Sequence, residues 1–128
     1  MPAYQDYIAR AQVSEAFTLA DGLKTSISTN RQNGTCFAPA GTAGTAGTAD
    51  KLEGKYGTAT ILEENANTVG NLTCGIHYQF KTTGVSDKLK GKEIVLKVNE
   101  DSGKLTLESV KSKETSDGMS KYLPSAFQ

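Results

Sequence analysis

The stretch that decides the fold of this chain is residues 1–30, MPAYQDYIARAQVSEAFTLADGLKTSISTN. Its apolar side chains recur at steps of three and four residues, and they are Ile8, Ala9, Val13, Ala16, Phe17, Ala20, Leu23 and Ile27. This period is typical of an amphipathic helix, and the charged side chains fall largely outside the stripe. A helix over these residues would be on the order of 40 Å long, about three times the usual globular helix.

The start of this helix has no capping residue, because no Ser, Thr, Asp or Asn precedes the helical pattern. Pro2 suits a first helical turn. A frayed surface helix would explain this start. We interpret it instead as a Met placed within a longer helix whose upstream part has been removed. The helix should end near Asn30, where the periodicity breaks ahead of Gly34.

The composition is that of one soluble domain. The chain has 128 residues, with 14 Lys plus Arg against 14 Asp plus Glu. This balance leaves no overall field to attract nucleic acid or anionic membranes. No apolar run approaches the roughly 18 residues that a membrane span needs. We expect a single domain over residues 1–128.

Residues 31–55 form a long connection after the helix. Its middle, residues 41–49, repeats Gly-Thr-Ala three times, which indicates a flexible and exposed loop. Thr42, Thr45 and Thr48 are candidates for O-glycosylation, with an unmodified loop as the alternative.

From Tyr56 the period changes to two, which predicts an antiparallel sheet over residues 56–110. The clearest strand places Cys74, Ile76, Tyr78 and Phe80 on one face and polar residues on the other. A sheet with one apolar face needs a cover on that side only, and the N-terminal helix supplies it. Residues 111–128 form a C-terminal region.

The two cysteines, Cys36 and Cys74, lack a metal-type spacing. Two buried free thiols are one interpretation. We favour a disulfide, which would close the loop that contains the Gly-Thr-Ala repeat and contribute roughly 4 kcal/mol. A disulfide implies an oxidising compartment.

The sequence gives no support for an enzyme. His77, the single histidine, is an odd number of residues from Cys74, so a strand puts them on opposite faces. Glu63 and Glu64 diverge in the same way and are expected as a solvated loop pair. The turn 99–102 is better explained as a hairpin than as a calcium loop. We therefore expect no catalytic residue, cofactor or metal site.

Several segments resemble one known family. Residues 3–12 (AYQDYIARAQ), 14–16 (SEA) and 19–24 (LADGLK) are similar to the first helix of bacterial type IV pilins. The similarity begins just after that family's apolar, membrane-spanning segment. It continues at residues 54–56 (GKY) and 121–124 (KYLP), and so covers essentially the whole chain.

The resemblance implies an α+β fold in which a long N-terminal helix packs on a four-stranded antiparallel sheet. It also implies a major pilin, a structural subunit that polymerises with its own copies into a bacterial surface pilus with the help of an assembly machinery. Such filaments serve adhesion, twitching motility and often DNA uptake. Before assembly the subunit is held in the inner membrane by the missing apolar segment. Alternatives are a DNA-binding minor pilin and a type II secretion pseudopilin.

The same resemblance points to contact residues on the helix side away from the sheet. Tyr4, Tyr7 and Arg10 are the candidates, and the alternative for the two tyrosines is that they are ordinary half-exposed aromatics. One departure from the family is Phe127, which stands where most relatives carry a cysteine that bounds the C-terminal loop. The chain resembles instead the subset whose disulfide ties the loop after the helix to the sheet.

A basic cluster completes the candidate sites. Lys88, Lys90 and Lys92 are close in sequence and are candidates for contact with DNA phosphates. A host surface is a further possible partner of the filament, with no residues assigned to it. The alternative is that these lysines protect the strand ends from aggregation.

Overall fold

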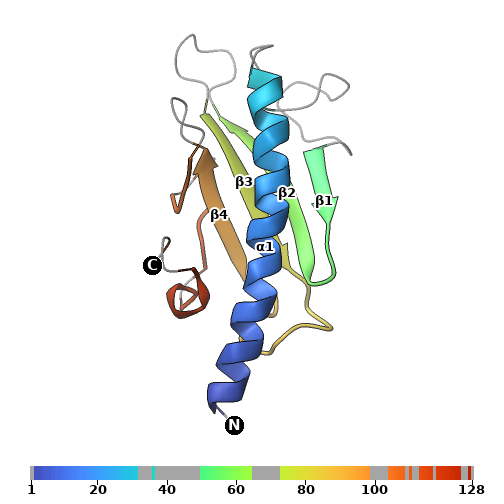
Figure 1. Cartoon of the computed structure of the whole chain (residues 1–128), viewed down its shortest axis with the longest axis vertical. Coiled ribbons are helices and arrows are strands. Elements are labelled where there is room, and N and C mark those ends of the chain that lie inside the picture. The colour runs from blue at the N-terminus through green and yellow to red at the C-terminus, as the bar shows by residue number, and fades with distance from the viewer. Residues whose placement is uncertain are drawn as a thin grey trace.

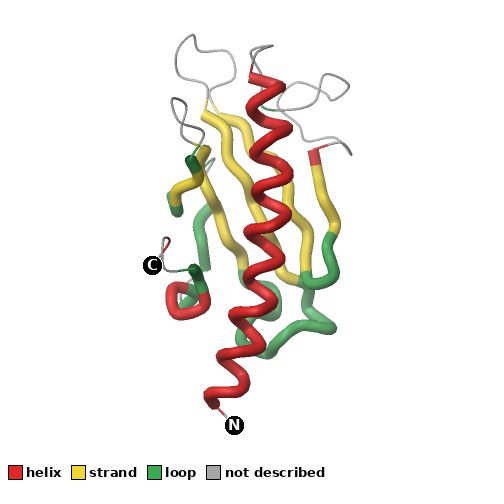
Figure 2. Tube along the Cα trace, in the orientation of Figure 1, coloured by secondary structure: helices red, strands yellow, loops and turns green. Residues whose placement is uncertain are grey.

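The computed structural model describes residues 2–31, 36, 50–64, 73–98, 104–108, 110, 113–116, 118–124 and 127, with the backbone alone for 2–6, 31, 64 and 120. One long helix, α1 (Pro2–Arg31), lies along a twisted antiparallel sheet (Figure 1). The helix bounds agree with the expected stretch within one residue. The N-terminal turns of α1 project beyond the end of the sheet (Figure 2).

The sheet has five strands, and each pairs with its neighbour along the chain in the order β1-β2-β3-β4-β5. Their bounds are β1 (Lys51–Glu53), β2 (Gly57–Glu64), β3 (Thr73–Phe80), β4 (Glu93–Val98) and β5 (Leu105–Thr106). A short 3-10 helix, η2 (Ser120–Tyr122), follows near the C-terminus.

The expected number of four strands was wrong, because β1 lies within residues 31–55, where the sequence predicted only a connection. All three residues of β1 are exposed, so the strand carries no apolar alternation. It forms because the tight turn into β2 pairs Lys51 with Thr60 and Glu53 with Thr58. Pairing with a neighbouring strand thus overrides the weak intrinsic strand preference of these three residues.

The main core lies between α1 and the sheet. The helix contributes a buried stripe of small and medium side chains, Ala9, Val13, Ala16, Ala20, Leu23 and Ile27. The sheet contributes the larger ones, including Ile61, Ile76, Tyr78, Phe80, Ile94 and Leu96. This packing confirms the predicted amphipathic helix and the expected α+β architecture.

Glu15 joins the helix to the sheet by polar contacts. Its carboxylate accepts hydrogen bonds from the backbone N–H groups of Lys55 (3.2 Å) and Tyr56 (3.1 Å), and from the hydroxyl of Tyr78 (3.1 Å). Gly54 makes room for it, because a Cβ there would lie 2.2 Å from Glu15 Oε1. This carboxylate therefore fixes the turn before β2 against α1.

The face of the sheet turned away from α1 is more buried than the sequence predicted. On β3, Gly75 and His77 are buried although they lie on that face. Val110 covers part of it, packing with Leu62 and Val95. The expected cover on one side only is therefore corrected: the chain after β5 returns over this face.

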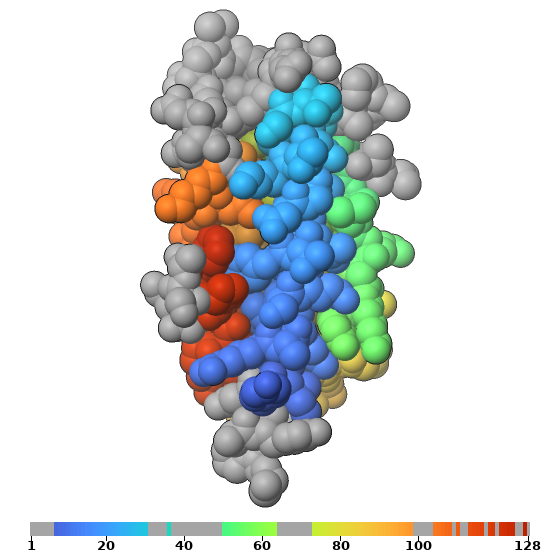
Figure 3. Space-filling view, viewed as in Figure 1, coloured from blue at the N-terminus to red at the C-terminus, as the bar shows by residue number. Residues whose placement is uncertain are grey.

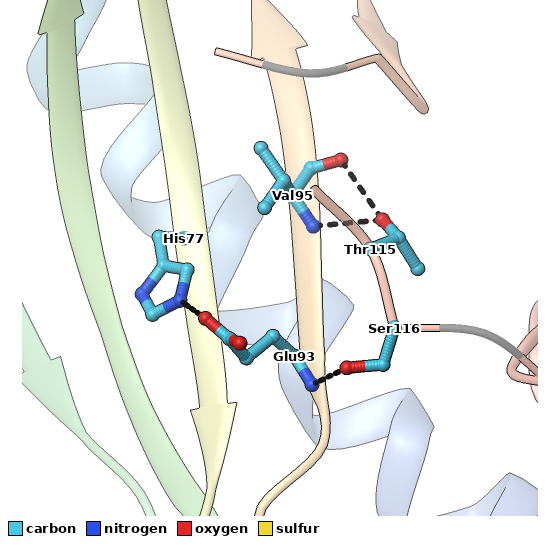
Figure 4. Close-up of polar contacts among 5 residues, drawn as sticks. All are labelled: His77, Glu93, Val95, Thr115 and Ser116. Atoms are coloured by element: carbon cyan, nitrogen blue, oxygen red, sulfur yellow. Dashed lines mark hydrogen bonds and ion pairs between the residues drawn. The ribbon is translucent and has the colours of Figure 1, made fainter. Parts of the chain in front are cut away.

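The outer edge of β4 is capped by a segment that we call the C-terminal strap, residues 113–116 (Figure 4). The Thr115 hydroxyl lies 3.0 Å from Val95 N and 3.4 Å from Val95 O, so it replaces a strand partner with one side chain. Ser116 accepts from the N–H of Glu93 through its hydroxyl (2.9 Å) and donates its own N–H to Glu93 O (2.9 Å). The strap thereby satisfies an edge that would otherwise invite pairing with another chain.

Replacing Glu15 with Ala should lower the free energy of unfolding by about 2–3 kcal/mol, because Tyr78 and two backbone donors lose a charged acceptor. Chemical denaturation of the purified domain measures this loss. Glu53→Ala is the matched control, since Glu53 is exposed. An equal loss in both variants would show that the Glu15 contacts do not hold the helix to the sheet.

Tyr78 should make the protein sensitive to alkaline pH. Burial beneath α1, and secondarily the charge of Glu15, raise the pKa of Tyr78 above its ordinary value of about 10. The unfolded chain therefore loses this proton first. The stabilisation from Tyr78 is complete below about pH 10 and declines as the pH rises further.

Denaturant unfolding at a series of pH values between about 9 and 11 measures this decline. The variant Tyr78→Phe has no phenol to ionise, so its stability should fall less steeply over the same range. Parallel curves for the two proteins would contradict the assignment.

Candidate functional site: the exposed face of the helix

The side of α1 opposite the buried stripe runs along the surface of the molecule (Figure 3). Its exposed residues are Tyr7, Arg10, Ala11, Ser14, Thr18, Asp21, Gly22, Thr25, Ser26, Ser28 and Thr29. We call the part from Ala11 to Thr29 the hydroxyl face, because most of its side chains are Ser or Thr. Solvent-exposed helix faces usually carry charged as well as polar side chains, whereas Asp21 is the one exposed charge among the described residues from Ala11 to Thr29.

The hydroxyls of this face are engaged by the helix itself. Ser14 and Thr18 donate to the carbonyl oxygens four residues earlier, at 3.2 and 3.1 Å. Thr25 and Thr29 do the same at 3.3 and 3.4 Å. A hydroxyl that is already hydrogen-bonded costs less to bury, and small side chains allow another helix to approach closely. The face is thus suited to contact with a second protein surface.

The spacing of four residues in the pairs Ser14–Thr18 and Thr25–Thr29 is visible in the sequence. It did not lead us to predict a contact face, because polar residues outside an apolar helical stripe are usually solvated.

The contact candidates from the sequence lie at the N-terminal end of this side. Tyr7 is 77% exposed, more than an ordinary half-exposed aromatic. Arg10 is also exposed, and its Nε donates to the backbone oxygen of Lys121 (3.1 Å). Tyr4 belongs to α1, and its side chain lies outside the described residues. Arg10 therefore already has a partner within the chain, whereas the ring of Tyr7 is presented to solvent.

The C-terminal region packs beside α1. Met119, Tyr122 and Leu123 are buried in the main core. The ring of Phe127 lies on Phe17, with 4.7 Å between the ring centroids. Phe127 is thus held on α1 by an aromatic contact.

Cys36 and Cys74 form the expected disulfide, with a Cα–Cα distance of 5.6 Å. The backbone N–H of Cys36 donates to Glu63 Oε2 (2.6 Å), and Asn30 donates from Nδ2 to the carbonyl oxygen of Cys36 (3.1 Å). Glu63 is buried, so its expected place in a solvated loop pair was wrong: it lies in β2 opposite Cys74. The end of α1, the cysteine after it and two strands are joined at this point.

The three candidate lysines lie between β3 and β4, near the N-terminal half of α1. The backbone N–H of Ser86 donates to Gln12 Oε1 (2.8 Å) and docks this loop on the helix. Lys88 is exposed and Lys92 is half-buried. Lys90 forms an ion pair with Asp87 (2.9 Å), which lowers the pKa of the Asp87 carboxyl by hydrogen bonding and by charge.

The remaining candidate positions carry no described chemistry. Thr42, Thr45, Thr48 and the turn 99–102 lie outside the described residues. Within the part of the chain that is described, no three His, Cys, Asp or Glu side chains gather as a metal site. The described helices include none with the length and apolar character of a membrane span. His77 in β3 contacts Glu93 in the neighbouring strand β4, with 2.5 Å between His77 Nε2 and Glu93 Oε1 (Figure 4).

Comparisons with known proteins agree with this architecture. The sequence model of the pilins, described as bacterial filament proteins, matches residues 9–128. A fimbrial protein of Moraxella nonliquefaciens is 69% identical over 128 residues, which are all of this chain and 82% of that protein. The type IV major fimbrial protein FimA of Dichelobacter nodosus is 38% identical over 104 residues, 75% of this chain and 65% of that protein.

The fimbrial protein EcpC of Eikenella corrodens is 37% identical over 126 residues, 98% of this chain and 74% of that protein. These similarities extend over the helix, the sheet and the C-terminal region. This chain therefore belongs to the pilin family, as a type IV pilin and a structural subunit of a bacterial pilus.

Proposed function

We propose that this chain is the repeating major subunit of its pilus and that it packs against neighbouring copies through the hydroxyl face of α1. The observation that carries the proposal is the row of small, internally hydrogen-bonded side chains between Ser14 and Thr29. Such a row permits close packing without leaving buried polar groups that lack a hydrogen bond. Tyr7 extends the same contact toward the N-terminus.

In this proposal an assembly machinery adds subunits from the inner membrane to a filament outside the cell. The filament serves adhesion to host surfaces and twitching motility. The buried disulfide and the Glu15 contacts support such a use, because each subunit must keep its shape while its neighbours pull on it.

DNA contact is a second candidate function of the same filament. It is favoured by the exposure of Lys88, whose ammonium is free to meet a phosphate in solvent. Under this proposal Lys88, Lys90 and Lys92 act together, with Lys90 shared with Asp87.

Thr18→Lys in the full-length protein should abolish or strongly reduce filaments, because it places a long charged side chain in the middle of the proposed contact. Thr18 is exposed, so the thermal midpoint of the purified domain should change little. Electron microscopy with immunogold labelling measures the number and length of filaments on the source bacterium. Filaments of the unsubstituted protein should be labelled with immunogold along their whole length.

Gln79→Lys is the matched control, because Gln79 is exposed on the face of the sheet away from α1. Normal filaments from both variants would contradict the proposed contact. Gold restricted to filament tips would favour a minor pilin, and gold restricted to the cell envelope would favour a pseudopilin. Either pattern would overturn the assignment as major subunit.

A further inference from the structure

The positive charge of this chain is unevenly placed, although its formal net charge is zero. Three segments meet at the end of the sheet from which α1 projects: the β1–β2 turn, the β3–β4 loop and η2 (Figure 1). We call the cations at this end the basic end, and they are Arg10, Lys55, Lys81, Lys88, Lys92 and Lys121.

Hydrogen bonds hold these segments together. The N–H of Lys81 donates to Tyr56 O (2.9 Å), and the N–H of Gly91 donates to Lys81 O (3.2 Å), which joins the β1–β2 turn to the β3–β4 loop. Arg10 donates to Lys121 O (3.1 Å) and joins η2 to α1. The basic end is therefore built by tertiary structure from four separate parts of the sequence.

Few carboxylates oppose these cations among the described side chains. Asp87 is paired with Lys90 (2.9 Å), and Glu93, which follows Lys92, contacts His77 (2.5 Å). Glu15 is engaged with the β1–β2 turn and with Tyr78. Glu53, in the neighbouring strand β1, is exposed. Lys55, Lys81, Lys88 and Lys121 are exposed as well, so the surface of this end carries a net positive charge.

An exposed aromatic ring accompanies the cations. Tyr7 is 77% exposed and lies one helical turn before Arg10 on the same side of α1. Tyrosine beside lysine and arginine is the combination found where proteins meet the headgroup region of a membrane.

We propose that the basic end binds the surface of an anionic phospholipid bilayer. Lipid phosphates attract the lysines, the ring of Tyr7 enters the headgroup region, and the N-terminal turns of α1 point toward the bilayer. This inference goes beyond filament formation, because it assigns a lipid contact to the soluble domain itself.

The arrangement fits a lipid surface better than a DNA duplex. In Figure 1, η2 lies on one side of α1 and the β1–β2 turn lies on the other, and the β3–β4 loop passes behind α1 between them. A broad bilayer meets all three segments around a projecting helix at once. A duplex binds along a stripe or with an element in its groove, and α1 interrupts such a stripe between η2 and the β1–β2 turn (Figure 1).

The test uses this chain and vesicles of phosphatidylglycerol and phosphatidylcholine in equal parts, with pure phosphatidylcholine vesicles as the neutral reference. Co-sedimentation at low salt should show binding to the anionic vesicles alone, and added salt should weaken it. The triple substitution Lys81→Gln, Lys88→Gln and Lys92→Gln should reduce the partition coefficient by about a hundredfold, at roughly fivefold per lysine.

The matched control is Lys24→Gln, Lys97→Gln and Lys113→Gln, which removes the same charge from other parts of the molecule. It should leave most of the binding. Thermal unfolding confirms that both triple variants are folded. Tyr7→Ala should weaken binding to anionic vesicles without changing its salt dependence, because it removes an uncharged contact.

Equal losses in the two triple variants, or equal binding to neutral vesicles, would overturn the proposal. Binding to duplex DNA at a salt concentration where vesicles are not bound would also overturn it, in favour of a DNA site. These outcomes are separate from the filament proposal. That proposal is tested by counting filaments on bacteria that carry Thr18→Lys, whereas vesicle binding is measured on the purified chain.

Discussion

The contact between α1 and the sheet depends on the small size of three helical residues. Ala9, Ala16 and Ala20 are fully or almost fully buried, so the helix can lie close to strands whose side chains are large. Tyr78 and Phe80 belong to the same core as these alanines and pack edge to face at 4.8 Å. Apolar packing alone would tolerate sliding along the helix axis. The directional hydrogen bonds of Glu15 oppose such sliding and fix the position along the axis.

This close packing determines what the opposite face of the helix can be. The part of α1 that packs on the sheet presents one continuous strip to its surroundings, and here most of that strip is Ser and Thr, four of which donate to their own backbone. A strip of lysine and glutamate would have been equally compatible with the fold of the monomer. Under the proposed filament contact, the small residues on this face meet a requirement that lies outside the domain, namely close approach of a neighbouring subunit.

The sequence predicted the elements that carry a strong period, namely α1 and the strands with alternating apolar residues. It could not predict β1, because three exposed residues have no pattern apart from their pairing with β2. It placed Glu63 in solvent because the position of Cys36 above that carboxylate depends on a distant contact across the loop. The basic end was seen only in part. Lys88 and Lys92 are close in sequence, whereas Lys121 joins them only in the folded chain.

Tyr7 belongs to both proposed surfaces, the filament contact and the lipid contact. A single side chain cannot be buried in a headgroup region and against a neighbouring subunit at once, so the two contacts compete at this residue. The part of the hydroxyl face from Thr18 to Thr29 does not share this conflict, since it lies farther along α1 than Arg10, Gln12 and Glu15, which contact the segments of the basic end. Under the two proposals, a subunit can begin to contact a neighbour through the hydroxyl face while Tyr7 is still in contact with lipid. If the filament contact then replaces the lipid contact of Tyr7, its ring passes from one partner to the other without a stage in which it is surrounded by water.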